Sequence, residues 1–490
     1  MILQRRTVCY LVGKILQVEA LLLLLPLIVS LIYRESFHQL LSYAGTIALL
    51  VVIGTVCTLA KPKNMKIMPR DGIVTVALSW ILLSFFGGLP FVFEGEIPNL
   101  ADAFFETASG FTTTGSSILS DLSILGYSSL FWRSFTHLVG GMGVLVFALA
   151  ILPSTGSDSV QLMRAEVPGP VFGKLVSKLA KTARILYAIY LVMTAILVII
   201  LMLVKVPLFD ALLLSFGTAG TGGFSINNAG FAIYQNPEMV EWIIGVGMML
   251  FGVNFNLYYF LLLGSIREVL TDEEGRSYIG IIAFASVAIF ASLSIVQSQL
   301  DVPFRSVFFT VSSIITTTGY STADFGLWGV FPQVVLLLLM FIGGCAGSTA
   351  GGIKVSRVVI YVKNSIAEIK KMGQPRRVIM PKFNGKVVDD KMSSGIANYL
   401  LVYVAVFLVL LISASFEAPD FLTAFSSVAA TFNNIGPGLG EVGPTSNFSM
   451  YSDFNTILLS LGMIAGRLEI YPMILLFSTT SLGAFFVSEK

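Results

Sequence analysis

The sequence has little charge and few of the side chains that build metal or disulfide sites. Only 12% of its 490 residues are charged, about half the share of roughly 25% found in soluble domains. Lys and Arg number 30 against 28 Asp and Glu, so no field exists to attract a polyanion. Two His and three Cys leave little material for a transition-metal site. With 55% hydrophobic residues, these shortages exclude a soluble enzyme, a disordered protein and a nucleic-acid-binding protein.

Cysteine and tryptophan are expected to have packing roles. The cysteines fall in apolar stretches, which predicts free buried thiols and argues against a disulfide scaffold. They are Cys9, Cys57 and Cys345. Trp132, Trp242 and Trp328 fall near the ends of apolar runs, where indole rings commonly anchor a protein at the membrane interface.

Long apolar runs are abundant. A helix needs about 20 mostly apolar residues to cross the hydrocarbon core. Ten runs approach or exceed this length: 8–33, 40–60, 73–93, 128–152, 183–206, 239–264, 278–298, 328–360, 394–416 and 454–487. We therefore expect an all-α polytopic membrane protein. The first run lacks a small-residue cleavage site and a second span follows it, so a cleaved signal peptide is not expected.

Basic residues gather in three segments between these runs, 61–71, 164–184 and 363–391. In the ten-span order the three lie on one side, and an excess of Lys and Arg marks the cytoplasmic side. Both termini should then be cytoplasmic. The first segment on the other side carries four acids: Glu94, Glu96, Asp102 and Glu106. These are either ordinary solvated loop charge or an outer vestibule that concentrates cations.

A short semi-apolar segment follows the third, fifth, seventh and ninth runs. The four are 99–117, 207–225, 302–321 and 418–438. Each stands between two full runs, so a unit of span, re-entrant helix, loop and span repeats four times after two additional N-terminal spans. The expected divisions are 1–71 for the two extra spans and 72–160, 161–268, 269–372 and 373–490 for the four pore repeats. The re-entrant helices start near Asn99, Asp210, Asp301 and Asp420, most of which should be N-caps.

An irregular loop at membrane depth is tolerated only where protein buries it or water lines it. Four such loops can meet this requirement by converging on one axis, where the negative ends of four short helices favour a cation. The loops read TTTG at 112–115 and 316–319, GTGG at 220–223 and NNIG at 433–436. One such cluster usually marks only a helix end. Four copies in equivalent places favour a filter of backbone carbonyls, with Gly permitting the required dihedrals.

Several motifs together resemble the TrkH-like membrane subunits of the Trk/Ktr/HKT potassium transporter superfamily. They are ADAFFE (101–106), SGFTTTG (109–115), GGMG (140–143), ILP (151–153), RAEVPGP (164–170), IITTTGYS (314–321), GGCAGSTAGGIK (343–354), NNIGPGLG (433–440) and GRLEI (466–470). The resemblance covers essentially the whole chain. It implies four pseudo-equivalent repeats around one pore, a homodimer with one pore per subunit, and residence in the cytoplasmic membrane of a prokaryote.

The resemblance also implies gating by a cytosolic, TrkA-like nucleotide-binding regulatory subunit. This chain has no Gly-rich nucleotide motif beside a predicted strand, so any nucleotide effect must come through that partner. No cofactor is expected, and potassium is the substrate and the only metal. Carried over to this sequence, one carbonyl layer of the filter comes from Thr112, Gly220, Thr316 and Asn433. The next layer comes from Thr113, Thr221, Thr317 and Asn434. The filter glycines are Gly115, Gly223, Gly319 and Gly436.

Two features are candidate gates below the filter. Five glycines within 343–352 should break the long run there, as an intramembrane gating loop by resemblance or as a small-residue packing motif. The glycines are Gly343, Gly344, Gly347, Gly351 and Gly352. Arg467 lies well inside the last run, where a charge costs at least about 2.5–3.5 kcal/mol unless it faces protein or water. By resemblance it projects into the pore, whereas the alternative is a buried pair with Glu469 or another acid.

The leading function is therefore potassium uptake driven by the membrane potential, worth about 2.3 kcal/mol per charge per 100 mV. The alternative is symport of potassium with sodium or protons, for which Glu469 is the obvious intramembrane carboxylate. A membrane enzyme would need a catalytic cluster that two His do not provide, and a sensory protein would need a large soluble output domain. Arg133 and His137 lie four residues apart and predict a polar contact without a firmer role.

Overall fold

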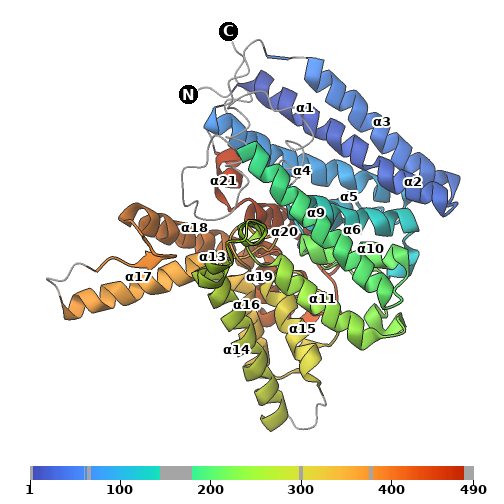
Figure 1. Ribbon diagram of the computed structural model, residues 1–490. Coiled ribbons are helices and arrows are strands. Elements are labelled where there is room, and N and C mark those ends of the chain that lie inside the picture. Colours follow the sequence, from blue (N-terminus) through green and yellow to red (C-terminus); the bar gives the residue numbers. More distant parts are fainter. Residues whose placement is uncertain are drawn as a thin grey trace.

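The computed structural model describes residues 4–59, 61–62, 68–143, 179–296, 302–374 and 379–478. Over these ranges nearly all of the regular secondary structure is helical (Figure 1). A single antiparallel hairpin joins β1 (Lys382–Phe383) to β2 (Lys386–Val387), with Lys382 opposite Val387. The all-α class expected from the sequence is confirmed.

Six long helical rods are apolar enough to cross a membrane. They are α1 (Arg5–Leu22) continued by α2 (Leu24–Ile32), α3 (Phe37–Leu59), α4 (Pro69–Glu94), α9 (Leu179–Leu203), α14 (Glu273–Val296) and α18 (Asp390–Ala414). The last four each precede a short re-entrant helix. These short helices, which we call pore helices, are α5 (Leu100–Phe111), α10 (Leu208–Gly220), α15 (Phe304–Ile315) and α19 (Phe421–Phe432).

A further helix follows each pore helix, and the last three of these four are interrupted. They are α6 (Tyr127–Gly141), α11 (Pro237–Phe251) with α12 (Phe255–Leu262), α16 (Val330–Ile342) with α17 (Val355–Gly373), and α20 (Asp453–Arg467) with α21 (Tyr471–Phe477). The remaining short elements are α13 (Ile266–Thr271) and the 3-10 turns Leu122–Ile124, Gly230–Ile233, Phe325–Leu327 and Gly440–Val442. We call α6, α11, α16 and α20 the inner helices.

Continuous spans over 239–264 and 454–487 were expected, and that expectation is wrong. The axis bends by 89° between α11 and α12, where Gly252 ends one helix and the Asn254 side chain accepts from the Asn256 N–H at 3.0 Å to cap the next. Glu469 and Ile470 take left-handed φ values of 59° and 68° after α20, a conformation that L-residues do not continue as a helix. Among the described residues, six helical spans are long and apolar enough to cross a membrane, or seven if the bent pair is counted as one span. The sequence predicts ten.

Inner helices end directly beneath the pore helices. A Cβ added to Gly140 of α6 would collide with the carbonyl of Phe111, and one added to Gly466 of α20 would collide with that of Phe432. Phe111 and Phe432 are the last residues of α5 and α19. Glycine is required at both positions because the two backbones touch, which places the lower ends of these inner helices against the loops that follow the pore helices.

The N-terminal rods α1 and α3 pack against each other and on α4, at one side of the bundle (Figure 1). Gly13 and Gly54 let them cross closely, since a Cβ on either would approach the carbonyl oxygen of the other within 2.9 Å. Close approach through small residues is how membrane helices associate. From the other end of the sequence, α21 also packs against α4.

Two packing expectations need correction. Cys345 is buried, but Cys57 is half-buried and Cys9 exposed on the surface of the chain, because the outer helices turn one side to the surroundings. Trp132 and Trp328 are fully buried instead of anchoring an interface. The Trp132 indole donates to the Gly87 carbonyl at 2.9 Å, which satisfies its N–H inside the bundle.

The basic segments that predict orientation are only partly described. Residues 63–67 of the first segment and 164–178 of the second lie outside the described residues, as do the motifs ILP and RAEVPGP. The third segment, 363–391, is the end of α17 and the hairpin that returns the chain to α18.

Candidate ion-conduction site

The four loops after the pore helices share one backbone path. The second residue of each loop is left-handed, at φ 55° for Thr113, Thr221 and Thr317 and 59° for Asn434. The next residue of each donates its N–H to the carbonyl five positions back, at 2.8–2.9 Å. These bonds are Thr114 to Ser109, Gly222 to Gly217, Thr318 to Ser313 and Ile435 to Ala430. Four segments far apart in sequence therefore share one backbone conformation and one backbone hydrogen bond.

The loop glycines bring the four loops into a closed ring. A Cβ on Gly115 would collide with the Gly222 carbonyl, one on Gly223 with that of Thr318, and one on Gly319 with that of Ile435. Gly436 closes the circle, since its Cβ would lie 3.0 Å from the Thr114 carbonyl oxygen. All four also have positive φ, from 68° to 107°. Each glycine is therefore needed twice, for its backbone conformation and for contact with the next loop.

Side chains brace three of the loops. Thr112 and Thr114 share a hydroxyl hydrogen bond of 2.7 Å, and Thr316 and Thr318 share one of 2.8 Å. In the fourth loop, the Asn433 carbonyl oxygen Oδ1 accepts from the Tyr403 hydroxyl at 2.7 Å. Asn434 Nδ2 donates to Thr114 Oγ1 at 2.9 Å, across to the first loop. The second loop has glycine at the bracing positions.

Two of the four expected N-caps are present. Asn99 accepts from the Ala101 N–H at 2.8 Å, and Asp420 accepts from the Thr423 N–H at 2.8 Å. Asp210 does not cap α10, because Pro207 holds that position and the Asp210 carboxylate accepts from the Tyr234 hydroxyl at 3.1 Å. Asp301 lies outside the described residues.

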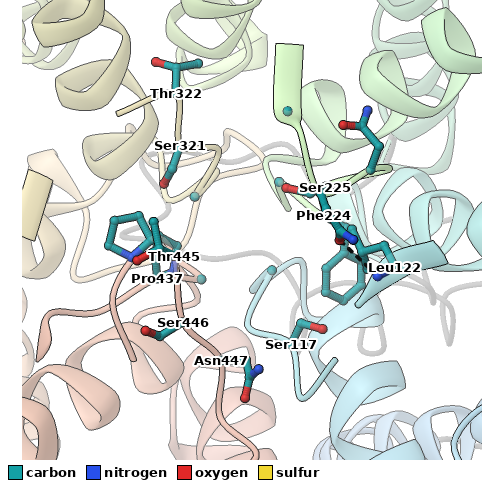
Figure 2. A pocket seen from close by; sticks show the side chains of 18 of the residues that line it. Ser117, Leu122, Phe224, Ser225, Ser321, Thr322, Pro437, Thr445, Ser446 and Asn447 are labelled. Carbon is teal, nitrogen blue, oxygen red and sulfur yellow. Dashed lines mark hydrogen bonds between the residues drawn. The ribbon is translucent and has the colours of Figure 1, made fainter. Parts of the chain in front are cut away.

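A cavity of about 730 Å³ opens on one side of the ring. Figure 2 shows residues from all four repeats around it, among them Ser117, Ser225, Ser321 and Ser446. Its charged lining residues are Arg133, Glu238, Glu241, Arg305 and Asp324. A mostly polar funnel with fixed carboxylates thus leads to the ring.

The acids predicted for this vestibule are elsewhere. Glu94, Glu96, Asp102 and Glu106 are absent from the cavity lining. Glu106 is 1% exposed, so it is not solvated loop charge either. Its carboxylate accepts from Arg133 Nε at 2.8 Å, from the Ser117 hydroxyl at 3.0 Å and from the Ile118 N–H at 3.2 Å.

Two ion pairs, one buried and one partly exposed, fasten the loops on either side of the second one. Arg133 pairs with Glu106 of the first repeat, and its NH1 reaches the Ser225 carbonyl beyond the second loop at 3.2 Å. Arg305 at the start of α15 pairs with Glu241 of α11, which also accepts from Thr322 at 2.7 Å. Sequence reasoning missed both pairs. A signal existed, since Arg133 and Glu241 each lie 18 residues after their loop glycine.

On the other side of the ring lies the loop between α16 and α17, residues 343–354. The predicted helix break is present, with Gly343, Gly347 and Gly352 left-handed at φ 73–74°. Cys345 donates its N–H to the Gly252 carbonyl, and Phe255 donates to the Gly347 carbonyl, both at 3.0 Å. This intramembrane loop is therefore docked into the break between α11 and α12.

Glu274 of α14 fastens the intramembrane loop at both ends. One carboxylate oxygen accepts from the Ala346 N–H at 2.6 Å and from the Ser356 N–H at 3.0 Å. Gly344 and Gly351 approach other backbones closely, since a Cβ on Gly344 would lie 3.2 Å from the Gly252 carbonyl and one on Gly351 would collide with that of Asn433.

Arg467 joins the intramembrane loop to the first repeat. Its NH1 donates to the Thr349 carbonyl at 2.7 Å, and its NH2 donates to the Gly140 and Gly141 carbonyls at 2.6 and 2.7 Å. Glu469 instead pairs with Arg357 at 2.6 Å, which rules out a simple Arg467–Glu469 pair. Arg467 thus binds main-chain carbonyls at the C-terminal end of α6.

Comparison with known proteins identifies the family. The family model described as "TrkH: Cation transport protein" matches residues 42–277 and 279–486. The Trk system potassium uptake protein TrkH of Escherichia coli (strain K12) is 35% identical over 484 residues, covering 97% of this chain and 99% of its own length. TrkH of Salmonella typhimurium is 34% identical over 483 residues, with the same two coverages.

A solved structure agrees. The crystal structure of the potassium transporter TrkH from Vibrio parahaemolyticus superposes with a TM-score of 0.86 at 32% identity, covering 98% of this chain and 100% of that one. The matched family is one of transport proteins and not of enzymes, as the composition predicts. The ring of four loops, the intramembrane loop beneath it and the full-length matches lead to one conclusion: this chain belongs to the TrkH family of cation transport proteins.

Proposed function

We propose that this chain carries potassium across the cytoplasmic membrane of a prokaryote, through the axis of the four-loop ring. The observation that carries the proposal is the closed circle of loops, in which each glycine touches the equivalent carbonyl of the next loop. Rings of backbone carbonyls replace the hydration shell of potassium in selective pores. The first layer is Thr112, Gly220, Thr316 and Asn433, and the second is Thr113, Thr221, Thr317 and Asn434.

The gate in this proposal is the intramembrane loop together with Arg467. The loop belongs to the third repeat and contacts the second through Gly252 and the fourth through Asn433. Through Arg467 it is tied to the end of α6 in the first repeat. A segment that contacts all four repeats on one side of the ring is well placed to obstruct the ion path until it moves.

Passive uptake is favoured over coupled symport. The membrane potential alone supplies about 2.3 kcal/mol per charge per 100 mV. The carboxylate that would have supported coupling, Glu469, is paired with Arg357, which fits a structural role. Coupling to sodium or protons remains the alternative for the experiment below to decide.

The assembly proposed for the chain follows its relatives. They are Trk system proteins, and the motif resemblance implies a homodimer gated by a cytosolic, TrkA-like nucleotide-binding subunit. The basic segments of the sequence support cytoplasmic termini. The intramembrane loop and α17 would then face the partner, and the cavity in Figure 2 would face outward.

Flux measurements on the purified protein in liposomes test the function. With an inside-negative potential we expect uptake of potassium and rubidium in preference to sodium, without a sodium or proton gradient. Equal sodium uptake would overturn the selective filter. Uptake that stops when both gradients are removed would instead establish symport.

A further inference from the structure

The second loop lacks the side-chain hydrogen bonds that brace the other three. Gly220 and Gly222 stand where Thr112 and Thr114 share a hydrogen bond in the first loop. The hydroxyl of Thr221 donates only to the carbonyl of its neighbour Gly220, at 2.6 Å. Something outside the loop must therefore hold it in the shape that the ring requires.

His137 of α6 occupies the space behind this loop. A Cβ on Gly222 would collide with the imidazole, whose Cγ, Cδ2 and Nδ1 are the three nearest atoms to it. A Cβ on Gly220 would collide with the His137 main-chain carbonyl. His137 is 0% exposed and stacks on Phe224 with centroids 4.3 Å apart and planes 25° apart. The imidazole thus packs between the second loop and the Phe224 ring.

The contacts of this imidazole are steric. Within the part of the chain that the structure describes, neither imidazole nitrogen has a hydrogen-bond partner. Arg133, one turn earlier on α6, is bonded to Glu106 and to the Ser225 carbonyl. Buried side chains pack closely, and removing one leaves a cavity that its surroundings fill only in part. An unbraced loop beside such a cavity would gain freedom to move.

We propose that His137 is a positioning residue for ion selectivity. Its imidazole takes the place of the missing side chains and holds the second loop in register with the other three. The inference rests on the proposed function of the ring as a filter. Gly222 is not among the left-handed residues of the chain that the structure describes, so its backbone conformation does not require glycine. It is glycine because the His137 imidazole needs the space.

A compensation experiment tests this complementarity with the full chain in liposomes. His137→Ala and Gly222→Ala should each lower the potassium-to-sodium flux ratio by about five- to tenfold, the first by leaving a cavity and the second by collision. The double variant should recover most of the ratio, because the new methyl group enters the vacated space. Additive losses in the double variant, or an unchanged ratio in His137→Ala, would overturn the proposal.

Gly220→Ala is the matched control. Its Cβ would meet the main-chain carbonyl of residue 137, which remains in His137→Ala, so that background should not rescue it. If His137→Ala does not fold, His137→Phe keeps a flat ring without nitrogens and should retain the ratio. A folded His137→Phe protein that loses selectivity contradicts a steric role. Gly319→Ser separates the two levels: if it too leaves the ratio unchanged, the filter assignment itself has failed.

Discussion

The Gly351 N–H donates to the side-chain Oγ1 of Thr317 at 2.6 Å, which joins the intramembrane loop directly to the third loop of the ring. A Cβ on Gly351 would also lie 3.1 Å from the Asn434 Cβ in the fourth loop. No room for a side chain remains at Gly351 between the intramembrane loop and the four-loop ring. Movement of the intramembrane loop must therefore break a contact with the ring, so the proposed gate and the proposed filter touch directly.

We expect shortening of the intramembrane loop by residues 346–349 to raise basal flux severalfold and to weaken dependence on the regulatory subunit. Thr317→Val removes only the hydroxyl that accepts from Gly351, so its effect should have the same sign and be smaller, near the roughly 0.5–1.5 kcal/mol of one hydrogen bond. Flux per folded molecule, with and without the partner, measures both. A folded deletion variant with wild-type flux would favour a packing role for the glycines.

Gly319→Ser should lower the preference for potassium over sodium about tenfold or more, equivalent to about 1.4 kcal/mol or more. Gly319 is left-handed at φ 86°, and a Cβ there collides with the Ile435 carbonyl. The ring would be distorted while the opening persists. Relative rubidium and sodium flux in liposomes checks this, with Gly373→Ser as control because nothing lies within 4 Å of a Cβ there. An unchanged ratio would remove the filter assignment.

How far the sequence predicts this site depends on how local each signal is. The loops could be placed because Gly319 and its three equivalents each carry their own conformational requirement. The break at 343–352 could be placed because five glycines are concentrated there. The break at Gly252 could not, since one glycine in an apolar run is also common in unbroken membrane helices. That kink depends on Asn254 and on docking of Gly347, which is distant in sequence.

The ion pairs could not be predicted for a related reason, because their partners lie in different segments of the sequence. Glu106 reads as one of several loop acids, and only the folded chain brings it to Arg133 on the next helix. Arg467 illustrates the same limit. The sequence shows that a buried charge needs a partner, but its partners are main-chain carbonyls of Gly140 and Thr349, and every residue type supplies those.

Arg133→Ala should destabilise the protein by about 3–5 kcal/mol, because it leaves the Glu106 carboxylate buried without its counter-charge. Changing Glu106 and Arg133 together to Gln removes both charges and should cost less than either single change. Thermal unfolding in detergent compares Arg133→Ala, the two single Gln variants and the double variant. Equal or greater loss in the double variant would show that the hydrogen bonds of Glu106 to Ser117 and Ile118 matter more than the charge pair.

Stability should depend on pH through Glu96, which lies between α4 and α5. Burial raises the pKa of its carboxyl from 4.5 to about 7, and the Gly126 N–H donates to it at 2.7 Å. Because the pKa of Glu96 is raised in the folded state, its contribution to the free energy of unfolding is full below pH 4.5 and is lost as pH rises through 7. Glu96→Gln should match wild type near pH 4.5 and be more stable at pH 8, by at most about 3 kcal/mol. Lower stability of Glu96→Gln at pH 8 would show that the ionised form is favoured.

Arg467→Ala should increase flux without abolishing selectivity. Unit charges a few ångströms apart interact by about 4 kcal/mol at an effective dielectric near 20, so a fixed cation below the ring repels potassium. The substitution also releases the Thr349 carbonyl of the intramembrane loop from Gly140 and Gly141. Both effects favour conduction, and neither touches the carbonyl layers of the ring.

Arg467→Lys separates the two contributions. Lysine keeps the charge but not the planar fork of donors that spans Thr349 and the end of α6, so its flux should fall between wild type and Arg467→Ala. A purely structural arginine predicts a different pattern, in which Arg467→Ala lowers the melting temperature and the folded yield while flux per folded molecule stays constant. Flux and melting temperature measured on the same preparations distinguish these outcomes. A well-folded Arg467→Ala protein with wild-type or lower flux would show that Arg467 does not obstruct the ion path.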